Sequence, residues 1–179
     1  MKKDSVYKLV FTALMAALVC VATFLRFPLL GSKVHLGNTL CLLSGLLLGG
    51  PAGGLAAGIG SALNDLVSGY PIDEALVTFV SKFLMALLCA LLAGKGENRG
   101  RMILGCAFGA LGYVALYMLK TFVYRRFIYG YTPDAVWATM LSKLPASLIN
   151  AAFAIVVAPI LFGALRPALQ KAGLLEKMR

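Results

Sequence analysis

Six apolar stretches, separated by short polar or glycine- and proline-containing segments, dominate the sequence. A helix that crosses the hydrocarbon core of a bilayer needs about 20 mostly apolar residues. The first, fourth, fifth and sixth stretches are close to this length, and the second and third are shorter. We therefore predict six transmembrane helices, at residues 6–25, 36–49, 52–67, 75–93, 102–123 and 145–165.

Glycine and proline separate the second stretch from the third. Taken as one helix, residues 36–67 would be about 48 Å long at 1.5 Å per residue, which is too long for one bilayer. Gly49, Gly50 and Pro51 combine the residue that commonly ends helices with the one that cannot continue them. We therefore predict a tight hairpin of two helices here, with five spans or one broken helix as the alternatives.

The composition agrees with a membrane location. Of the 179 residues, 60% are hydrophobic and 13% are charged, whereas a soluble domain usually carries about a quarter charged residues. No polar linker divides the chain, so we predict a single all-α domain over residues 1–179, a multi-pass protein of the cell membrane. The net charge of +10 lies in clusters between apolar stretches. That pattern is typical of loops beside anionic lipid and argues against nucleic-acid binding.

The basic residues also predict the orientation of the chain, because cytoplasmic loops carry an excess of lysine and arginine. With the N-terminus in the cytoplasm, ten basic residues flank the inner helix ends and four flank the outer ends. We therefore place both termini in the cytoplasm. The inner set is Lys2, Lys3, Lys8, Lys95, Arg99, Arg101, Arg166, Lys171, Lys177 and Arg179, and the outer set is Arg26, Lys33, Arg125 and Arg126.

Polar residues within four of the predicted helices recur at intervals of three and four, so each set lies on one helix face. All four sets lie mainly in the outer half of their helices, and the inner half is almost purely apolar. A charge in mid-membrane costs about 2.5–3.5 kcal/mol, so Asp65 and Lys82 should face protein, a partner or water. The sets are Ser61, Asn64, Asp65 and Ser68; Thr78, Ser81 and Lys82; Tyr113, Tyr117, Lys120 and Tyr124; and Lys143, Ser147 and Asn150.

These stripes predict a pocket that opens outward, with aromatic walls for a flat ring and a few polar groups that orient it. Two simpler interpretations stay open. In the first, Asp65 and Lys82 form a structural salt bridge between the third and fourth helices. In the other, the tyrosines form an interfacial aromatic belt, although Tyr113 is too deep for such a belt.

Three outer connections, residues 26–37, 69–74 and 124–134, are expected to cover the pocket. They contain His35, the only histidine, which we interpret as a polar loop contact and not as a metal ligand or catalyst. The excess of basic residues suits a substrate with a carboxylate or phosphate, but acidic residues offset it, so a zwitterionic or neutral substrate is equally open. The candidate substrate-binding residues are Asn38, Asn64, Asp65, Tyr70, Lys82, Tyr113, Tyr117, Lys120, Lys143 and Asn150.

Sequence motifs for catalysis and nucleotide binding are absent. No G-x-x-x-x-G-K-[ST] sequence occurs, so the chain does not bind ATP through a Walker loop. H-E-x-x-H, G-x-S-x-G and an acidic cluster suited to a metal ion are also missing. The sequence therefore disfavours an enzyme, and we expect this chain to bind neither a cofactor nor a metal.

Several segments combine into a recognisable set of motifs: residues 35–38 (HLGN), 46–54 (LLLGGPAGG), 58–66 (GIGSALNDL) and 68–71 (SGYP), followed by Lys82. Together they resemble the substrate-binding S components of energy-coupling factor (ECF) vitamin transporters, over almost the whole chain. The similarity is greatest to the branch with riboflavin-, pyridoxine- and hydroxymethylpyrimidine-type members. Ala13 and Ala17 match the small-residue motif by which the first helix of this family docks onto the transmembrane coupling subunit.

The resemblance implies that the protein captures a vitamin or vitamin precursor outside the cell. It also implies association with a module of one membrane coupling subunit and two ATPase subunits, which use the ATP. The S component then topples in the membrane to release its substrate inside. The family places its pocket at the outer side, where the polar stripes lie, and Asn38 stands where relatives often carry an acid.

Two other functions are the alternatives to an S component. A stand-alone secondary carrier, driven by a proton or sodium gradient, would show an internal repeat and a site at mid-membrane. No repeat is evident in this sequence, and the polar stripes lie off-centre. A small intramembrane enzyme or an assembly factor would show turnover or a protein client.

Overall fold

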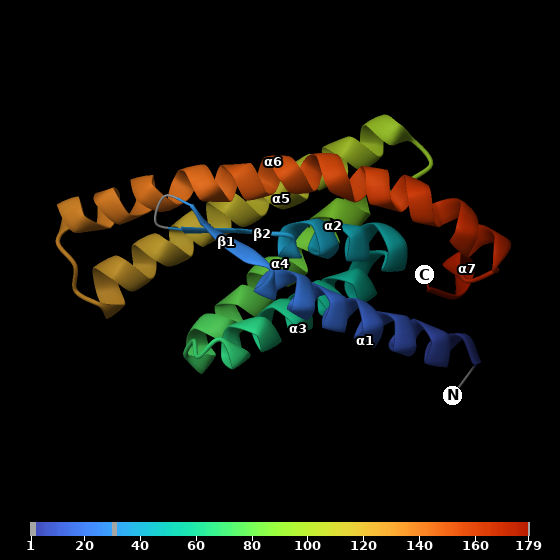
Figure 1. The fold of residues 1–179 in the computed structure, drawn as a ribbon, viewed down its shortest axis with the longest axis horizontal. Coiled ribbons are helices and arrows are strands. Elements are labelled where there is room, and N and C mark those ends of the chain that lie inside the picture. Colours follow the sequence, from blue (N-terminus) through green and yellow to red (C-terminus); the bar gives the residue numbers. More distant parts are fainter. Residues whose placement is uncertain (1–2, 30–31, 179) are drawn as a thin grey trace.

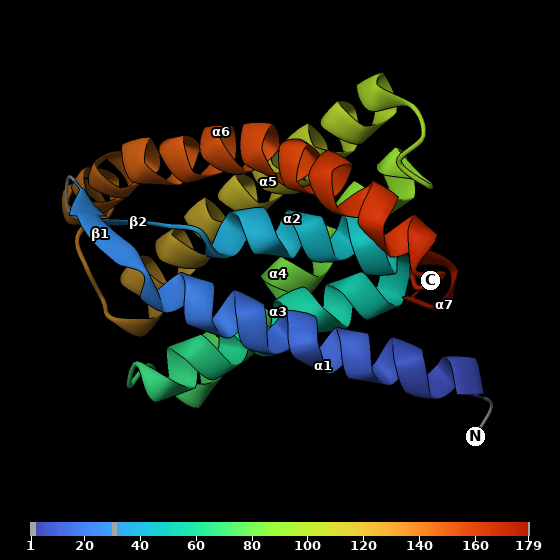
Figure 2. The same ribbon diagram turned by 45° about the vertical axis from the view of Figure 1, so that its right-hand side comes forward.

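In the computed structural model, which describes residues 3–29 and 32–178, six helices run along the long axis of the molecule (Figure 1). Successive helices alternate in direction, so the start of the first and the short last helix, α7, lie at the same end of the bundle (Figures 1 and 2). The elements are α1 (Lys3–Phe24), β1 (Arg26–Leu29), β2 (Ser32–His35), α2 (Gly37–Leu48), α3 (Gly50–Val67), α4 (Ile72–Ala93), α5 (Arg99–Val123), the π-helix η1 (Tyr124–Ile128), α6 (Pro133–Lys171) and α7 (Leu175–Met178).

The second helix, α2, forms the centre of the bundle. It packs against α1, α3, α4 and α6, and every residue of it except Leu40 is buried. It ends at Gly49, whose φ of 73° is accessible to glycine without strain. α3 then begins at once, with Pro51 in its first turn, and the hydroxyl of Ser44 donates a hydrogen bond to the Gly53 carbonyl (2.9 Å). The predicted helical hairpin is confirmed.

Small residues bring the backbones of α2, α4 and α5 into close contact. A Cβ atom on Gly45 would lie 2.5 Å from the carbonyl oxygen of Ala86. A Cβ atom on Gly109 would lie 2.6 Å from the carbonyl oxygen of Met85. Because side chains larger than hydrogen do not fit at these positions, both glycines fix the spacing between helices.

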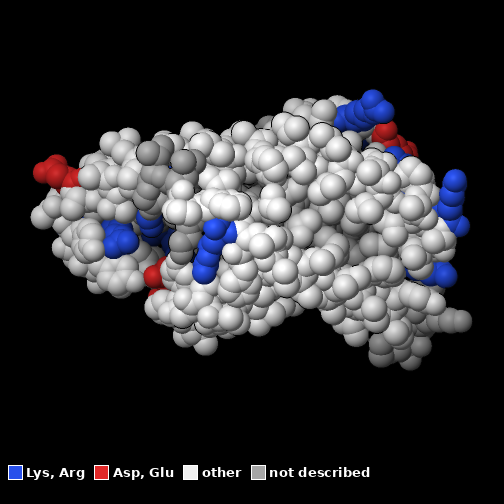
Figure 3. All heavy atoms as spheres, viewed as in Figure 1, with Lys and Arg blue, Asp and Glu red and all other residues white. Residues whose placement is uncertain are grey.

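Four helical segments are long and apolar enough to cross a membrane: Ser5–Phe24, Ile72–Ala93, Arg99–Ile128 and Pro133–Lys171. α2 is apolar but shorter. On the face seen in Figure 3, charged side chains lie over the left part and at the right-hand end, and the surface between these two groups shows none. These features are those of an all-α membrane protein. The basic side chains of Lys2, Lys3, Lys33 and Arg179 lie outside the part that the structure describes.

Two elements differ from the predicted boundaries. The first outer connection is an antiparallel β-hairpin, in which Arg26 pairs with His35 and Phe27 with Val34. The last long helix begins at Pro133 instead of residue 145. The Thr132 hydroxyl accepts a hydrogen bond from the Ala135 amide (3.4 Å) and caps its start. Pro145 lies inside the helix, and transmembrane helices tolerate proline where neighbouring groups satisfy the freed backbone carbonyl.

Candidate functional site

A cavity of about 380 Å³ lies at the end of the bundle that carries the β-hairpin. Its lining includes Arg26 of β1, Tyr70 between α3 and α4, and Tyr129 after η1, all of which belong to that end. This volume is in the range of small-molecule sites. All the residues predicted to bind substrate line this cavity: Asn38, Asn64, Asp65, Tyr70, Lys82, Tyr113, Tyr117, Lys120, Lys143 and Asn150.

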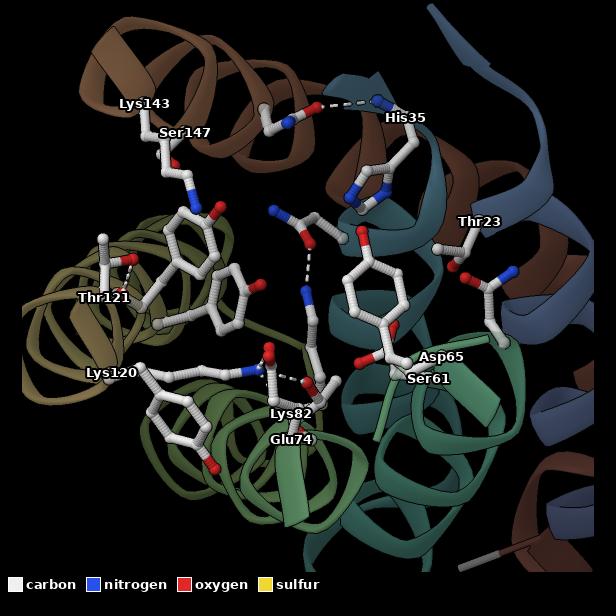
Figure 4. Close-up of a pocket in the computed structure, with 18 of the residues that line it drawn as sticks. Thr23, His35, Ser61, Asp65, Glu74, Lys82, Lys120, Thr121, Lys143 and Ser147 are labelled. Atoms are coloured by element: carbon white, nitrogen blue, oxygen red, sulfur yellow. Dashed lines mark hydrogen bonds and ion pairs between the residues drawn. The ribbon is translucent and has the colours of Figure 1, made fainter. Parts of the chain in front are cut away.

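The polar stripes meet in this cavity because each occupies the inward face of its helix. Figure 4 shows Asp65 from α3, Lys82 from α4, Lys120 from α5 and Lys143 from α6 around one common space. The helix periodicity of 3.6 residues explains why the polar residues of each stripe share a face. Whether these side chains bind a substrate remains a prediction.

Lys82 lies at the floor of the cavity and is 3% exposed. Its ammonium group donates a hydrogen bond to Oδ1 of Asn38, which comes from the buried first turn of α2. The same ammonium lies 3.4 Å from the centre of the Tyr113 ring, where the negative ring face attracts a cation. Lys82 thus contacts an amide and an aromatic face, and it does not form the salt bridge with Asp65 that the sequence left open as an alternative. Across the described residues, the one salt bridge is elsewhere in the cavity.

That salt bridge joins Lys120 of α5 to Glu74 of α4, with 3.1 Å between nitrogen and oxygen. The Lys120 ammonium also donates to the carbonyl oxygen of Glu74 (3.3 Å) and to the hydroxyl of Thr78 (3.5 Å). Both charged side chains are mostly buried, at 13% and 18% exposure. The pair therefore links two neighbouring helices and neutralises one basic residue of the cavity.

Two tyrosines of α5 form an aromatic wall. The rings of Tyr113 and Tyr117 are stacked, with 6.1 Å between their centres. The ammonium of Lys143, from α6, lies 5.6 Å from the centre of the Tyr117 ring. Tyr113 and Tyr117 therefore offer flat surfaces to a ring, and a lysine lies beside each of them.

Amide side chains connect the cavity to the surrounding elements. The Oδ1 atom of Asn150, on α6, accepts a hydrogen bond from the backbone amide of His35 (2.9 Å) and so holds the β-hairpin against α6. The Nδ2 atom of Asn64 donates to the carbonyl oxygen of Cys20 on α1 (3.3 Å). The imidazole of His35 accepts a hydrogen bond from the Gly37 amide (3.1 Å) and so starts α2. Asn64 and Asn150 thus have structural contacts as well as positions in the cavity wall.

Tyrosines and acidic residues form the rim of the cavity. Tyr124 donates a hydrogen bond to Asp73 (2.8 Å), and Tyr129 donates one to Glu74 (3.0 Å). The hydrogen bond and the negative charge of Glu74 raise the pKa of Tyr129. These contacts tie the segment around η1 to the start of α4.

Further residues line the cavity without having been among the candidates. Glu74 precedes Thr78 by four residues and Ser81 by seven, so extending the stripe of α4 by one turn would have found it. Thr121 follows Tyr117 by four residues and so lies on the stripe of α5, whereas Thr23 has no such signal, because single threonines are common in membrane helices. The additional lining residues are Thr23, Arg26, His35, Ser61, Glu74, Thr78, Thr121, Tyr124, Arg125, Tyr129 and Ser147.

The two alanines predicted to contact a partner lie away from the cavity. Ala13 and Ala17 are exposed on the outer face of α1. Large apolar side chains on the same helix, Leu14 and Leu18, are also exposed, at 52% and 44%. This face is covered by no other helix of the chain within the residues described, so it meets either lipid or another protein.

Comparison with known proteins supplies two matches. The model of the family described as "ECF-type riboflavin transporter, S component" matches residues 3–167, which is nearly the whole chain. A Pyrococcus woesei protein, described as an uncharacterized protein in the gap 3′ region, is 37% identical over 105 residues. That alignment covers 55% of this chain and 70% of the Pyrococcus protein.

Proposed function

This chain belongs to the family of ECF-type riboflavin transporter S components, and on that basis we propose a function in vitamin uptake. The protein is a membrane-embedded, high-affinity binding subunit that captures a small vitamin or vitamin precursor outside the cell. A partner ECF module then drives the uptake with ATP. The observation that carries this proposal is the polar, aromatic-walled cavity of about 380 Å³ at one end of an otherwise apolar bundle.

The proposed topology has six spans with both termini in the cytoplasm. The alternating direction of the six helices and the shared end of α1 and α7 support it (Figures 1 and 2). Basic residues at that end, among them Lys95, Arg99 and Arg101 in and beside the α4–α5 connection, agree with a cytoplasmic side. The cavity then faces outward, which suits capture from outside better than a carrier site at mid-membrane.

The proposed partners are a transmembrane coupling subunit and two ATPase subunits. The sequence has no Walker loop, which agrees with ATP hydrolysis on partner chains. The exposed small residues Ala13 and Ala17 on α1 allow the backbone of a partner helix to approach closely, which supports α1 as the docking helix.

Mass spectrometry of the small molecules released from the purified protein tests this function. The protein is extracted in detergent, washed and denatured, and the released molecules are compared with those from a Lys82→Ala, Asn150→Ala variant. A Lys95→Ala variant, changed at an exposed site outside the cavity, is the matched control. We expect a vitamin or vitamin precursor in the wild type and in the control but not in the cavity variant.

Folding of the cavity variant has to be checked separately, because Lys82 and Asn150 are both buried. A Tyr117→Leu variant, which alters the half-buried aromatic wall, provides a second test in a chain expected to fold. A wild-type protein that releases no small molecule, and whose thermal unfolding ignores a panel of vitamins, would contradict the proposed capture function.

A further inference from the structure

The charges that line the cavity are not balanced. Five basic side chains contribute to the wall but only two acidic ones, Asp65 and Glu74. An excess of one sign inside a cleft with low-dielectric walls concentrates ions of the opposite sign. The excess of positive charge therefore bears on the charge of the ligand that the cavity binds. The basic side chains are Arg26, Lys82, Lys120, Arg125 and Lys143.

Three of the basic residues have partners in the protein. Lys120 forms the salt bridge with Glu74. Arg125 donates to the Tyr131 hydroxyl (2.9 Å), and Arg26 donates to the Ser68 hydroxyl (3.3 Å), both near the rim. One acidic residue of the cavity is thus already used. Asp65, the other, forms no salt bridge with any described lysine or arginine.

Lys82 and Lys143 are different. Within the described part of the chain, neither ammonium group has a carboxylate at salt-bridge distance. Asn38 accepts one of the three N–H donors of Lys82, and the contact of Lys143 is the face of Tyr117. A buried or half-buried cation with no carboxylate at salt-bridge distance is costly, so both positions favour an anionic ligand.

Geometry brings the two lysines to the same aromatic wall. Lys82 lies 3.4 Å from the centre of the Tyr113 ring, and Lys143 lies 5.6 Å from that of Tyr117. The two rings are themselves stacked with centres 6.1 Å apart. In Figure 4 the two lysines extend into the cavity from different helices, α4 and α6. Both ammonium groups therefore lie beside one aromatic wall.

We infer that the ligand of this cavity is an anion, namely a flat-ringed molecule whose carboxylate or phosphate is bound by Lys82 and Lys143. The inference rests on the proposed function and selects among the substrates that the sequence left open. A carboxylate and a phosphate share the chemistry that the lysines recognise, which is an anionic oxygen accepting charge-assisted hydrogen bonds. A neutral flavin, the substrate suggested by the name of the family, supplies no such group.

Matched ligands that share one ring and differ in charge test the inference. The probes are pyridoxine, 4-pyridoxate and pyridoxine 5′-phosphate, together with riboflavin and riboflavin 5′-phosphate. Their affinities are measured by calorimetry on the full chain in nanodiscs, at low and at physiological salt. We expect an anionic member of at least one set to bind about tenfold or more tightly than its neutral counterpart, which corresponds to one charge-assisted contact. The carboxylate and phosphate forms distinguish the two anions.

Two single variants and a control locate the anion. Lys143→Gln and Lys82→Gln are each expected to lower the affinity for the anionic form about tenfold more than the affinity for the neutral form. Lys95→Gln, which removes an exposed lysine outside the cavity, should behave as the wild type. Lys143 is only half-buried, so its variant keeps the test decisive if Lys82→Gln fails to fold.

The outcomes separate this inference from the proposed function. Tighter binding of a neutral form, or an anion preference that both lysine variants retain, would overturn the inference and leave vitamin capture intact. The same holds if the molecule released from the wild-type protein carries neither a carboxylate nor a phosphate. If no probe binds and no molecule is released, the anion inference and the capture function both fail.

Discussion

The two halves of the bundle use the same helices for opposite purposes. Toward one end, Gly45, Gly105 and Gly109 let α2, α4 and α5 touch through their backbones. Toward the other end, the same helices carry large polar side chains, such as Lys82 and Tyr113, around a cavity. On α5 the two regions are one helical turn apart, because Gly109 packs closely against α4 and Tyr113 lines the cavity. We call these regions the glycine-packed half and the cavity half.

The difference shows how a membrane protein keeps a cavity open. In lipid, helices gain little from burying apolar surface against each other, so close packing of small residues provides much of the association. The glycine-packed half supplies this contact and fixes how closely the helices approach. The cavity half can then hold polar groups and empty space at a cost that the other half offsets.

The largest effect on stability should come from Gly109→Leu, which disrupts helix packing in the glycine-packed half. A Cβ atom there would lie 2.6 Å from the Met85 carbonyl oxygen, so α4 and α5 have to separate, at a cost of about 3 kcal/mol. Thermal unfolding in detergent should show a clearly lowered midpoint. Gly112→Leu on the same helix is the matched control, because its Cβ atom would meet only Leu88 at 3.5 Å. Equal destabilisation by both changes would contradict the proposed role of Gly109.

The next largest effect should come from Glu74→Gln in the cavity half. This change leaves the mostly buried Lys120 without its counter-ion. We expect a loss of stability of about 1–2 kcal/mol, between the cost of breaking a surface ion pair and that of breaking a buried one. The same thermal assay measures it, with the exposed Glu97→Gln as control. Adding Lys120→Met to Glu74→Gln should restore part of the loss, since no unpaired charge then remains. Purely additive losses would show that the pair contributes nothing as a pair.

A smaller and local effect is expected for Asn150→Ala. The change removes the acceptor for the His35 amide (2.9 Å), and one such hydrogen bond contributes about 1 kcal/mol. Hydrogen–deuterium exchange should become faster in β2 and remain unchanged in the glycine-packed half. Unchanged exchange in β2 would mean that other contacts hold the hairpin. Thr139→Ala, elsewhere on α6, tests whether any lost hydrogen bond of this helix has the same effect.

The smallest effect on the chain itself is expected for Ala13→Leu with Ala17→Leu. Both residues are exposed on α1 and belong to neither half, so thermal unfolding and ligand binding should change little. Co-purification with the coupling subunit should nevertheless be lost, because larger side chains keep a partner helix at a distance. Leu91→Phe on the exposed face of α4 is the control. Retained association of the double variant would exclude this face as the docking surface.

Much of this arrangement follows from the periodicity of the sequence. Polar residues three and four apart share a helix face, and stripes at equal depth in four antiparallel helices have to meet. That is why Asp65, Lys82, Lys120 and Lys143 line the same cavity. Gly49 and Pro51 likewise predicted the turn between α2 and α3, because their backbone preferences are local.

The same reasoning does not predict which side chains contact each other. Lys82 bonds Asn38 and not Asp65, because the side chain that a lysine meets depends on how closely α2 and α4 approach, and this distance is set by Gly45 against Ala86. The β-hairpin was missed for a different reason. It is too short for an alternating pattern to stand out, and strands of four residues depend on their surroundings for stability.

The shortness of α2 has a consequence for the biogenesis of the protein. Its 12 residues extend about 18 Å, well short of a hydrocarbon layer about 30 Å thick. α3 contains Asn64 and Asp65, and such residues oppose transfer into lipid. Neither segment is suited to leave the translocation channel alone. We therefore expect the two, joined at Gly49, to insert as a pair once α1 and α4 are available to shield them, which makes the insertion of this helical hairpin cooperative.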